Sequence, residues 1–307
     1  MRRLQRINNC SDSKRLDALI SWELREKEPK TGNTPFERVA AACGLTGRQY
    51  AIGHTFLPAR CVRAGQYSNG SKEFPWHAMA IGTHASIAPL KAYNFCEKCH
   101  QEDLSLYGIW HASRKHQIVG AEFCTSHGTP LHQADELPDS PSLDFRHLRQ
   151  TSCTLQRASS SERAAIEAYL SLYQQLLSGD RVEWAHALRT ALIQLCEQAF
   201  GKVEKHGTWN RNLTQSIAAT FPRAWLVEVL PTFHKWRAGA DFLPMQALFS
   251  ARSQPSTTAF LISIVSLLEG NRFDFSTLEN SENETANPAF LPESETASRR
   301  CVISSCV

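Results

Sequence analysis

The sequence predicts a mainly α protein in which two helical regions flank a small cysteine-containing module. Three observations support this fold class. Apolar residues recur at helical spacing over long stretches, capping residues and glycines mark the ends of these stretches, and two short cysteine-containing knuckles lie between them. The 307-residue length is enough for two modest domains, each with its own core.

The composition is that of an ordinary soluble chain, with 42% hydrophobic and 21% charged residues. No run of about 18 uninterrupted apolar residues is present, so we expect no membrane span. The basic residues near the start are followed by polar Asn8 to Asp12, where a signal peptide needs an apolar core. We therefore expect a cytoplasmic protein whose ten cysteines are reduced or bound to metal.

The net charge of +3 is unevenly distributed. Residues 1–75 contain thirteen Lys or Arg against seven acidic residues. This excess favours an anionic partner, although a solvated basic surface without a partner has the same composition.

A helix-turn-helix is predicted in the amino-terminal region. Thr34 caps a helix, Gly44 ends it in a left-handed conformation, and Thr46 caps a second helix that presents Arg48 and Gln49. Arg48 and Gln49 are therefore candidate nucleic-acid contacts. A short helical hairpin with a purely structural role has the same pattern, so the sequence leaves both interpretations open.

The two knuckles predict a single structural zinc site. Cys96 and Cys99 form a C-x2-C pair, and Cys124 and His127 form a C-x2-H pair about 25 residues later. Three thiolates and one imidazole make a closed tetrahedral shell, which leaves no open position for a reactive water. His132 is the next candidate for the fourth ligand.

Residues 100–123 are predicted to form a loop between the knuckles. Arg114 and Lys115 make a small basic cluster in this loop and are candidate nucleic-acid contacts. The alternation over 109–119 fits a short strand or a helix. The remaining histidines of this region are expected at the surface: His100, His111 and His116.

The carboxy-terminal half is predicted to be a helical bundle. Helices are expected over 162–178, 181–200, 213–219, 222–230 and 256–268, in addition to an amino-terminal helix over 14–30. Trp209, Trp225 and Trp236 are expected to anchor the core of the bundle. The predicted organisation is a helical, helix-turn-helix-like region (1–90), a zinc-binding module (91–135), a linker (136–160), a helical bundle (161–275) and a disordered tail (276–307).

The chain contains none of the common short catalytic motifs. We find no phosphate-binding G-x-x-x-x-G-K-[ST] loop, no G-x-S-x-G elbow and no H-E-x-x-H pair. With a closed metal shell as well, the sequence predicts a protein that is not an enzyme.

The region around the knuckles resembles the metal-binding core of the TniQ/TnsD family of bacterial transposition proteins. An aromatic residue precedes C-x2-C, Gly108 and Trp110 follow about ten residues later, and the second knuckle continues as C-x2-H-G-x-x-L. Weaker similarities are found at Leu16–Trp22, where Asp17 replaces the usual Glu, and at Phe221–Leu226.

This resemblance implies a role in choosing the target site for DNA transposition. Family members bind target DNA or a target-recognising complex, which includes guide RNA–protein complexes, and recruit the AAA+ ATPase of the transposon. A similar chain would leave ATP hydrolysis and strand transfer to its partners, and a homo-oligomer and the absence of a membrane partner are expected for this chain. An ordinary transcriptional regulator with a zinc-stapled helix-turn-helix is the alternative.

Overall fold

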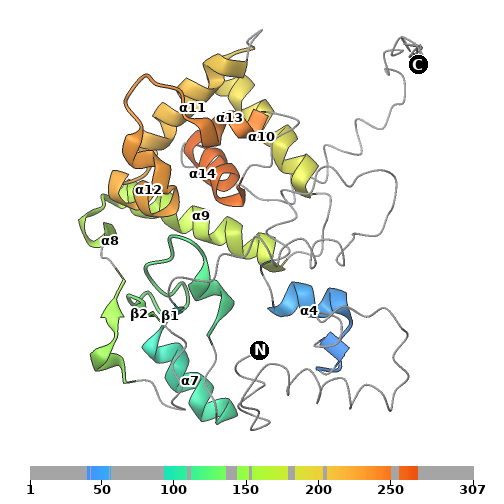
Figure 1. Ribbon diagram of the computed structural model, residues 1–307, viewed down its shortest axis with the longest axis vertical. Coiled ribbons are helices and arrows are strands. Elements are labelled where there is room, and N and C mark those ends of the chain that lie inside the picture. The colour runs from blue at the N-terminus through green and yellow to red at the C-terminus, as the bar shows by residue number, and fades with distance from the viewer. Residues whose placement is uncertain are drawn as a thin grey trace, which may run out of the picture. The chain divides into compact units, whose positions relative to one another are not determined.

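The computed structural model describes residues 40–41, 43–54, 56, 93–108, 112–135, 144–151, 154–178, 184–202, 206–249 and 256–268. Within these ranges the chain is mainly helical and contains one small antiparallel sheet, which confirms the predicted α class (Figure 1). No helix in the described ranges has the length and apolarity to cross a bilayer. The predictions for residues 14–30, for Trp110 and for the tail lie outside the described residues.

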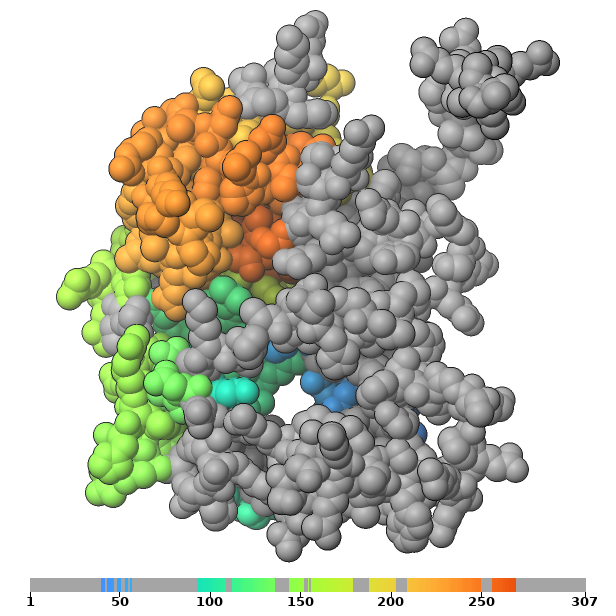
Figure 2. Space-filling view, viewed as in Figure 1, coloured from blue at the N-terminus to red at the C-terminus, as the bar shows by residue number. Residues whose placement is uncertain are grey.

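The carboxy-terminal helices include the five that the sequence predicts. They are α9 (Ser160–Ser178), α10 (Trp184–Phe200), α11 (His206–Thr220), α12 (Arg223–Val229), α13 (Leu243–Phe249) and α14 (Thr257–Leu267), with the short α8 (Thr154–Arg157) before them and the 3-10 turn η4 (Pro231–Lys235) after α12. In the space-filling view the orange part of the chain, which belongs to this bundle, forms one continuous surface (Figure 2).

Helix α14 is the centre of this bundle. Its residues from Thr257 to Ser266 are all buried, and it packs against α9, α10, α11 and α13. A helix that is apolar on every side is stable in water only when other helices surround it. Ser256 caps it by accepting a hydrogen bond from the Ala259 N–H at 3.0 Å.

Other helix ends also form as the sequence predicts. Ser159 accepts a hydrogen bond from the Glu162 N–H, and the Glu162 carboxylate accepts one from the Ser159 N–H, which makes a complete capping box for α9. Gly201 ends α10 with a φ of 78°. The three predicted tryptophan anchors are buried: Trp209, Trp225 and Trp236.

Helices α11 and α13 differ from the prediction, and the short α8 lies in the predicted linker. Helix α11 begins at His206 rather than at Leu213, because the buried residues Trp209, Leu213 and Ile217 continue one stripe at intervals of four through otherwise polar sequence. Helix α13 was not predicted, because seven residues with a proline at the second position give too little periodicity.

The cysteine-containing module is built on a three-stranded antiparallel sheet in the order β1-β2-β3. Strand β1 (Tyr93–Phe95) pairs with β2 (His132–Ala134), and β2 pairs with β3 (Arg149–Gln150), which follows the 3-10 turn η3 (Phe145–His147). The sheet thus brings the chain just before the first knuckle next to the chain just after the second.

The predicted loop between the knuckles is wrong over its first part, which forms helix α7 (Glu97–Tyr107). The sequence pattern does not predict this helix, because His100 is its only buried residue and no stripe of apolar residues runs along it. Gly108, with a φ of 66°, ends it. The ambiguous part of the loop contains a short 3-10 helix, η2 (Arg114–Gln117).

The turn of the predicted helix-turn-helix has the expected local geometry. Gly44 has a φ of 71°, and α4 (Gly47–His54) follows it. Thr46 accepts a hydrogen bond from the Gln49 N–H at 3.1 Å, and Gln49 Oε1 accepts one from the Thr46 N–H at 2.9 Å. Only residues 40 and 41 of the preceding helix are described, so the helix-turn-helix itself stays a prediction.

Candidate metal centre

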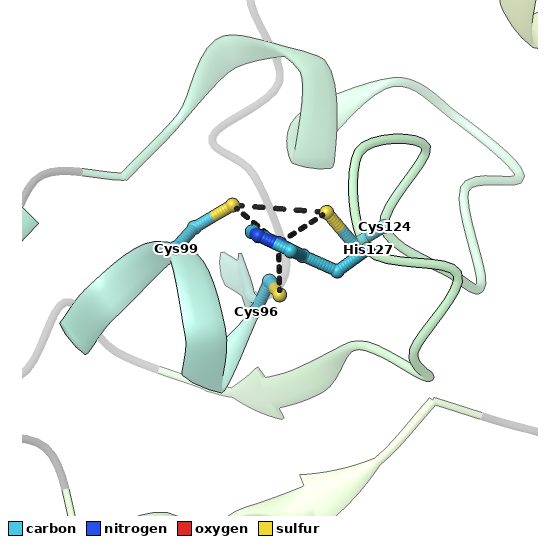
Figure 3. Close-up of side chains that lie close together, drawn as sticks. All are labelled: Cys96, Cys99, Cys124 and His127. Atoms are coloured by element: carbon cyan, nitrogen blue, oxygen red, sulfur yellow. Dashed lines mark hydrogen bonds between the residues drawn. The ribbon is translucent and has the colours of Figure 1, made fainter. Parts of the chain in front are cut away.

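The first knuckle is formed by the start of helix α7. Cys96 occupies the N-cap position with an extended backbone, and Cys99 lies in the first helical turn. The Cys96 carbonyl accepts a hydrogen bond from the His100 N–H, which begins the helical ladder. The cap and the third helical residue lie near one another at a helix start, so both sulfurs can approach the His127 ring (Figure 3).

The second knuckle is a tight turn. The Cys124 carbonyl accepts hydrogen bonds from the N–H groups of His127 and Gly128, and the Cys124 N–H donates to the Thr129 carbonyl at 2.8 Å. Gly128 has a φ of 64°, which a residue with a Cβ rarely adopts. This turn directs the Cys124 sulfur and the His127 ring to the two sulfurs of α7 (Figure 3).

The four side chains meet with the spacing of a tetrahedral zinc site. His127 Nδ1 lies 3.5, 3.3 and 3.6 Å from the sulfurs of Cys96, Cys99 and Cys124, and the Cys99 and Cys124 sulfurs are 3.7 Å apart. Tetrahedral bonds of about 2.3 Å to sulfur and about 2.05 Å to nitrogen place S and N about 3.6 Å apart and two S atoms about 3.8 Å apart. All four ligand atoms lie within 4.8 Å of one another, so they can hold one metal ion.

Glu102 orients the imidazole ligand. Its Oε1 lies 3.0 Å from His127 Nε2, on the side of the ring opposite the three sulfurs. The hydrogen bond with Glu102, followed by that with Cys96, raises the pKa of His127. A hydrogen on Nε2 leaves the Nδ1 lone pair for a metal, and a carboxylate partner makes the imidazole a stronger base. Glu102 was not predicted as a site residue, because its position relative to Cys99 becomes informative only once residues 97–107 are known to form a helix.

The thiols differ in how easily they ionise. Burial raises the pKa of Cys96, but hydrogen bonds from Thr129 and from the Cys99 backbone outweigh it and lower that pKa to about 7. Burial, with the nearby Cys124 and Cys96 sulfurs, raises the pKa of Cys99 to about 12. Three sulfurs this close oppose each other's ionisation, and a bound cation removes that cost because it deprotonates its thiol ligands. The donor set therefore fits a divalent metal.

The basic residues of η2 lie beside this centre. Lys115 donates a hydrogen bond to the Ser126 hydroxyl of the second knuckle, and its charge acts to lower the pKa of Cys99. Arg114 is half-buried, and burial lowers its pKa. Their predicted contact with nucleic acid stays a prediction, and the described contact of Lys115 is with the metal-binding module itself.

The other histidines that the structure describes in this region lie outside the four-residue cluster. His132, the alternative fourth ligand, lies on β2 with its ring 5.1 Å from that of Phe145, and it is outside the four-residue cluster. The expected surface location is wrong for His100 and His116, which are both buried. His116 packs into the module with Nε2 3.7 Å from the Cys99 sulfur. His111 lies outside the described residues.

The two predicted nucleic-acid contacts of the amino-terminal region, Arg48 and Gln49, belong to α4 and come well before the four clustered residues in the sequence. The Gln49 side chain caps this helix through Thr46, so it has a structural role whatever else it contacts. Arg48 lies on the same helix, but its side chain is outside the described atoms.

Comparisons of this chain with protein-family models, with curated proteins and with solved structures gave no match.

The four clustered side chains are suited to a structural metal ion rather than to a catalytic one. Four protein ligands fill a tetrahedral shell, so a metal held by them has no position for a substrate or water. Cys96 and Cys124 are completely enclosed, with 1% and 0% of their surface exposed. A metal here would fasten α7 to the turn at residues 124–128 and so hold the module together.

Proposed function

We propose that this chain binds one structural Zn²⁺ and acts as a non-catalytic target-site selection factor in DNA transposition. The observation that carries the metal part is the Cys96, Cys99, Cys124 and His127 cluster, whose distances match a tetrahedral zinc shell. The transposition part rests on the resemblance of the sequence around this cluster to the TniQ/TnsD family.

In this proposal the protein recognises target DNA, or a complex that has already found it, and recruits the AAA+ ATPase of the transposon. The chain itself performs no reaction, consistent with a closed metal shell. A module held by Zn²⁺ offers a rigid surface for such partners. The apparent free energy of binding a structural Zn²⁺ is about 10–16 kcal/mol, which is comparable to the free energy of unfolding of a whole domain, about 5–15 kcal/mol.

Two measurements test this proposal. Metal analysis of the purified full-length chain should find one zinc per chain. A pull-down with a candidate transposon AAA+ ATPase should retain the ATPase, and more of it when target DNA is present. Absence of the ATPase under both conditions would count against the transposition role, while absence of zinc would count against the metal assignment.

A salt titration of DNA binding separates a direct DNA reader from an adaptor. If several phosphates are contacted, the logarithm of the association constant should fall by several units per tenfold increase in salt. A flat response would favour an adaptor that touches DNA only through its partners.

A zinc-stapled transcriptional regulator is the second candidate, and it is favoured by the Gly44 turn and the capped α4. It predicts tight, sequence-specific binding of the chain alone to DNA near its own gene and no binding of an ATPase.

A further inference from the structure

Two exposed arginine side chains meet at one backbone carbonyl in the helical bundle. Arg223, the first residue of α12, donates a hydrogen bond from Nη2 to the Trp236 carbonyl at 3.3 Å, and Arg237 donates one from Nη1 to the same oxygen at 3.4 Å. The two nitrogens therefore lie no more than 6.7 Å apart, which is the sum of these two distances. Lys235, the last residue of η4, is also exposed. We call Arg223, Lys235 and Arg237 the α12–η4 cluster.

The turn that carries most of this cluster is fixed by buried aromatic residues. The Phe233 and Trp236 rings are stacked with their centroids 5.1 Å apart, and the Phe242 ring meets Phe233 edge-on at 5.3 Å. The Trp236 indole N–H donates a hydrogen bond to the Ala240 carbonyl at 2.9 Å. Because the aromatic side chains are buried, the basic residues between them are held at the surface on a rigid support.

The positive charge of the cluster is not balanced by neighbouring acids. In the part of the chain that the structure describes, the ion pairs involve other residues. Asp241, the first acid after the cluster in sequence, lies 3.6 Å from Arg211 Nε. Burial raises the pKa of Glu228, the one acid between Arg223 and Lys235 in sequence, and the charge of Arg149 lowers it, so Glu228 has its own cation nearby. A group of uncompensated cations raises the local potential and attracts an anion.

The chemistry of the cluster fits phosphate. A guanidinium presents planar N–H donors that match phosphate oxygens in pairs, and a lysine binds phosphate as a point charge. Two guanidiniums this close repel each other, and a phosphate between them removes the repulsion by accepting hydrogen bonds from both. All three cations are exposed, which suits an extended polymer with successive phosphates more than a small enclosed ligand. We propose that the α12–η4 cluster binds phosphates of a nucleic-acid backbone.

This contact adds a surface in the helical bundle to the candidate contacts on α4 and η2. It rests on the nucleic-acid binding of the proposed function and holds for both candidate functions. Phosphate contacts position a protein on nucleic acid without reading its sequence, so the cluster supplies affinity rather than target choice.

The test is a salt titration of DNA binding by the full-length, metal-bound chain, with a short fluorescent duplex of arbitrary sequence and anisotropy as the readout. The Arg223→Gln, Arg237→Gln double variant should bind about tenfold more weakly at low salt. The slope of log K against log salt should become less negative by about 2 in this variant and by about 1 in Lys235→Gln, because each phosphate contact contributes about 0.9. Arg211→Gln is the matched control, since Arg211 is already paired with Asp241, and it should leave the slope unchanged.

The outcomes separate this proposal from the proposed function. An unchanged slope in the double variant would overturn the proposal and leave DNA contact through α4 in place. No binding of the duplex by the unmodified chain at low salt would also overturn it, whereas retention of the ATPase in the pull-down would still support the adaptor form of the proposed function.

A second variant guards against loss of structure. The Arg223 guanidinium lies 5.9 Å from the centre of the Phe233 ring, so its replacement can loosen the turn, and thermal unfolding of each variant is measured first. If the double variant does not fold, Lys235→Gln decides, because the Lys235 side chain is exposed and forms no hydrogen bond or ion pair with the described residues. An unchanged slope in Lys235→Gln would then refute the assignment.

Competition separates nucleic acid from other anions. Unlabelled duplex should displace the labelled duplex, whereas polyglutamate of equal charge and inorganic phosphate at equal ionic strength should displace little of it. Equal displacement by polyglutamate would assign the cluster to an acidic protein, and equal displacement by inorganic phosphate would assign it to a free anion. Either result would overturn the nucleic-acid proposal.

Discussion

The indole Nε1 of Trp225 donates a hydrogen bond to the Gly120 carbonyl at 2.9 Å, across 105 residues of sequence. Trp225 is completely buried in the helical bundle, and Gly120 belongs to the segment between the two knuckles. Beside it, the Tyr169 hydroxyl donates to the Val119 carbonyl at 2.9 Å. These two contacts therefore join the segment between the knuckles to the helical bundle through backbone carbonyls and buried aromatic side chains.

Gly120→Ala should disrupt this junction. A Cβ at residue 120 would lie 2.5 Å from Val229 and 2.7 Å from the Trp225 ring, and the φ of 83° is unfavourable for alanine. We expect the free energy of unfolding to fall by about 2–4 kcal/mol in chemical denaturation. Gly239→Ala is the matched control, since Gly239 also has a positive φ but no atom within 4 Å, and it should cost only about 1–2 kcal/mol. Equal losses in the two variants would show that the close packing is unimportant.

Cys124→Ser should remove the metal and loosen the module while the helical bundle remains folded. Cys124 is one of the four candidate ligands, and its backbone forms the hydrogen bonds that close the second turn. The bundle has its own buried centre in α14, which does not depend on the site. Metal analysis and limited proteolysis will check this, and we expect new cleavage within 93–135 and protection of 160–178 and 206–249. Exposed Cys43→Ser should keep its zinc. Unchanged zinc content in Cys124→Ser would contradict the ligand assignment.

Glu102→Ala should lower the metal affinity about tenfold. Glu102 holds the Nε2 hydrogen of His127, and loss of such a partner typically costs 10- to 100-fold in metal affinity. The lower end is expected because Glu102 is largely exposed. Competition with a chromophoric zinc chelator measures the change. Glu102→Gln retains an acceptor and should recover part of the loss, and Glu97→Ala, on the same helix, should have little effect. Equal affinities for the Ala variants of Glu97 and Glu102 would rule out the orienting role.

Thr46→Ala should destabilise α4 by about 1 kcal/mol, since it removes the side-chain half of a capping box. Hydrogen exchange of amides 47–54 is the measurement, and exchange should accelerate about fivefold. If α4 binds DNA through Arg48, the Thr46→Ala variant should keep part of the DNA affinity. Arg48→Ala should lose that affinity while the exchange of amides 47–54 stays as slow as in the unmodified chain. A DNA affinity unaffected by Arg48→Ala would remove the case for α4 as a DNA-reading helix.

Much of this protein was determined by the sequence alone. Local chemistry specified the metal ligands, because a C-x2-C at a helix start and a C-x2-H in a tight turn each present two donors on one side. Local chemistry also specified the ends of α9, α10 and α14, because Ser159, Gly201 and Ser256 act on backbone groups within a few residues. Helix caps and the ligand spacing within each knuckle depend on residues within about one helical turn, so the sequence predicts them without knowledge of the tertiary structure.

Only the tertiary structure decided the remainder. Helix α7 has no apolar stripe, and its role becomes clear only when Glu102 meets His127 from 25 residues away. The burial of His100 and His116 and the meeting of Trp225 with Gly120 depend on chain segments distant in sequence. Close packing and long-range hydrogen bonds arise from three-dimensional proximity, which no local pattern of residues encodes.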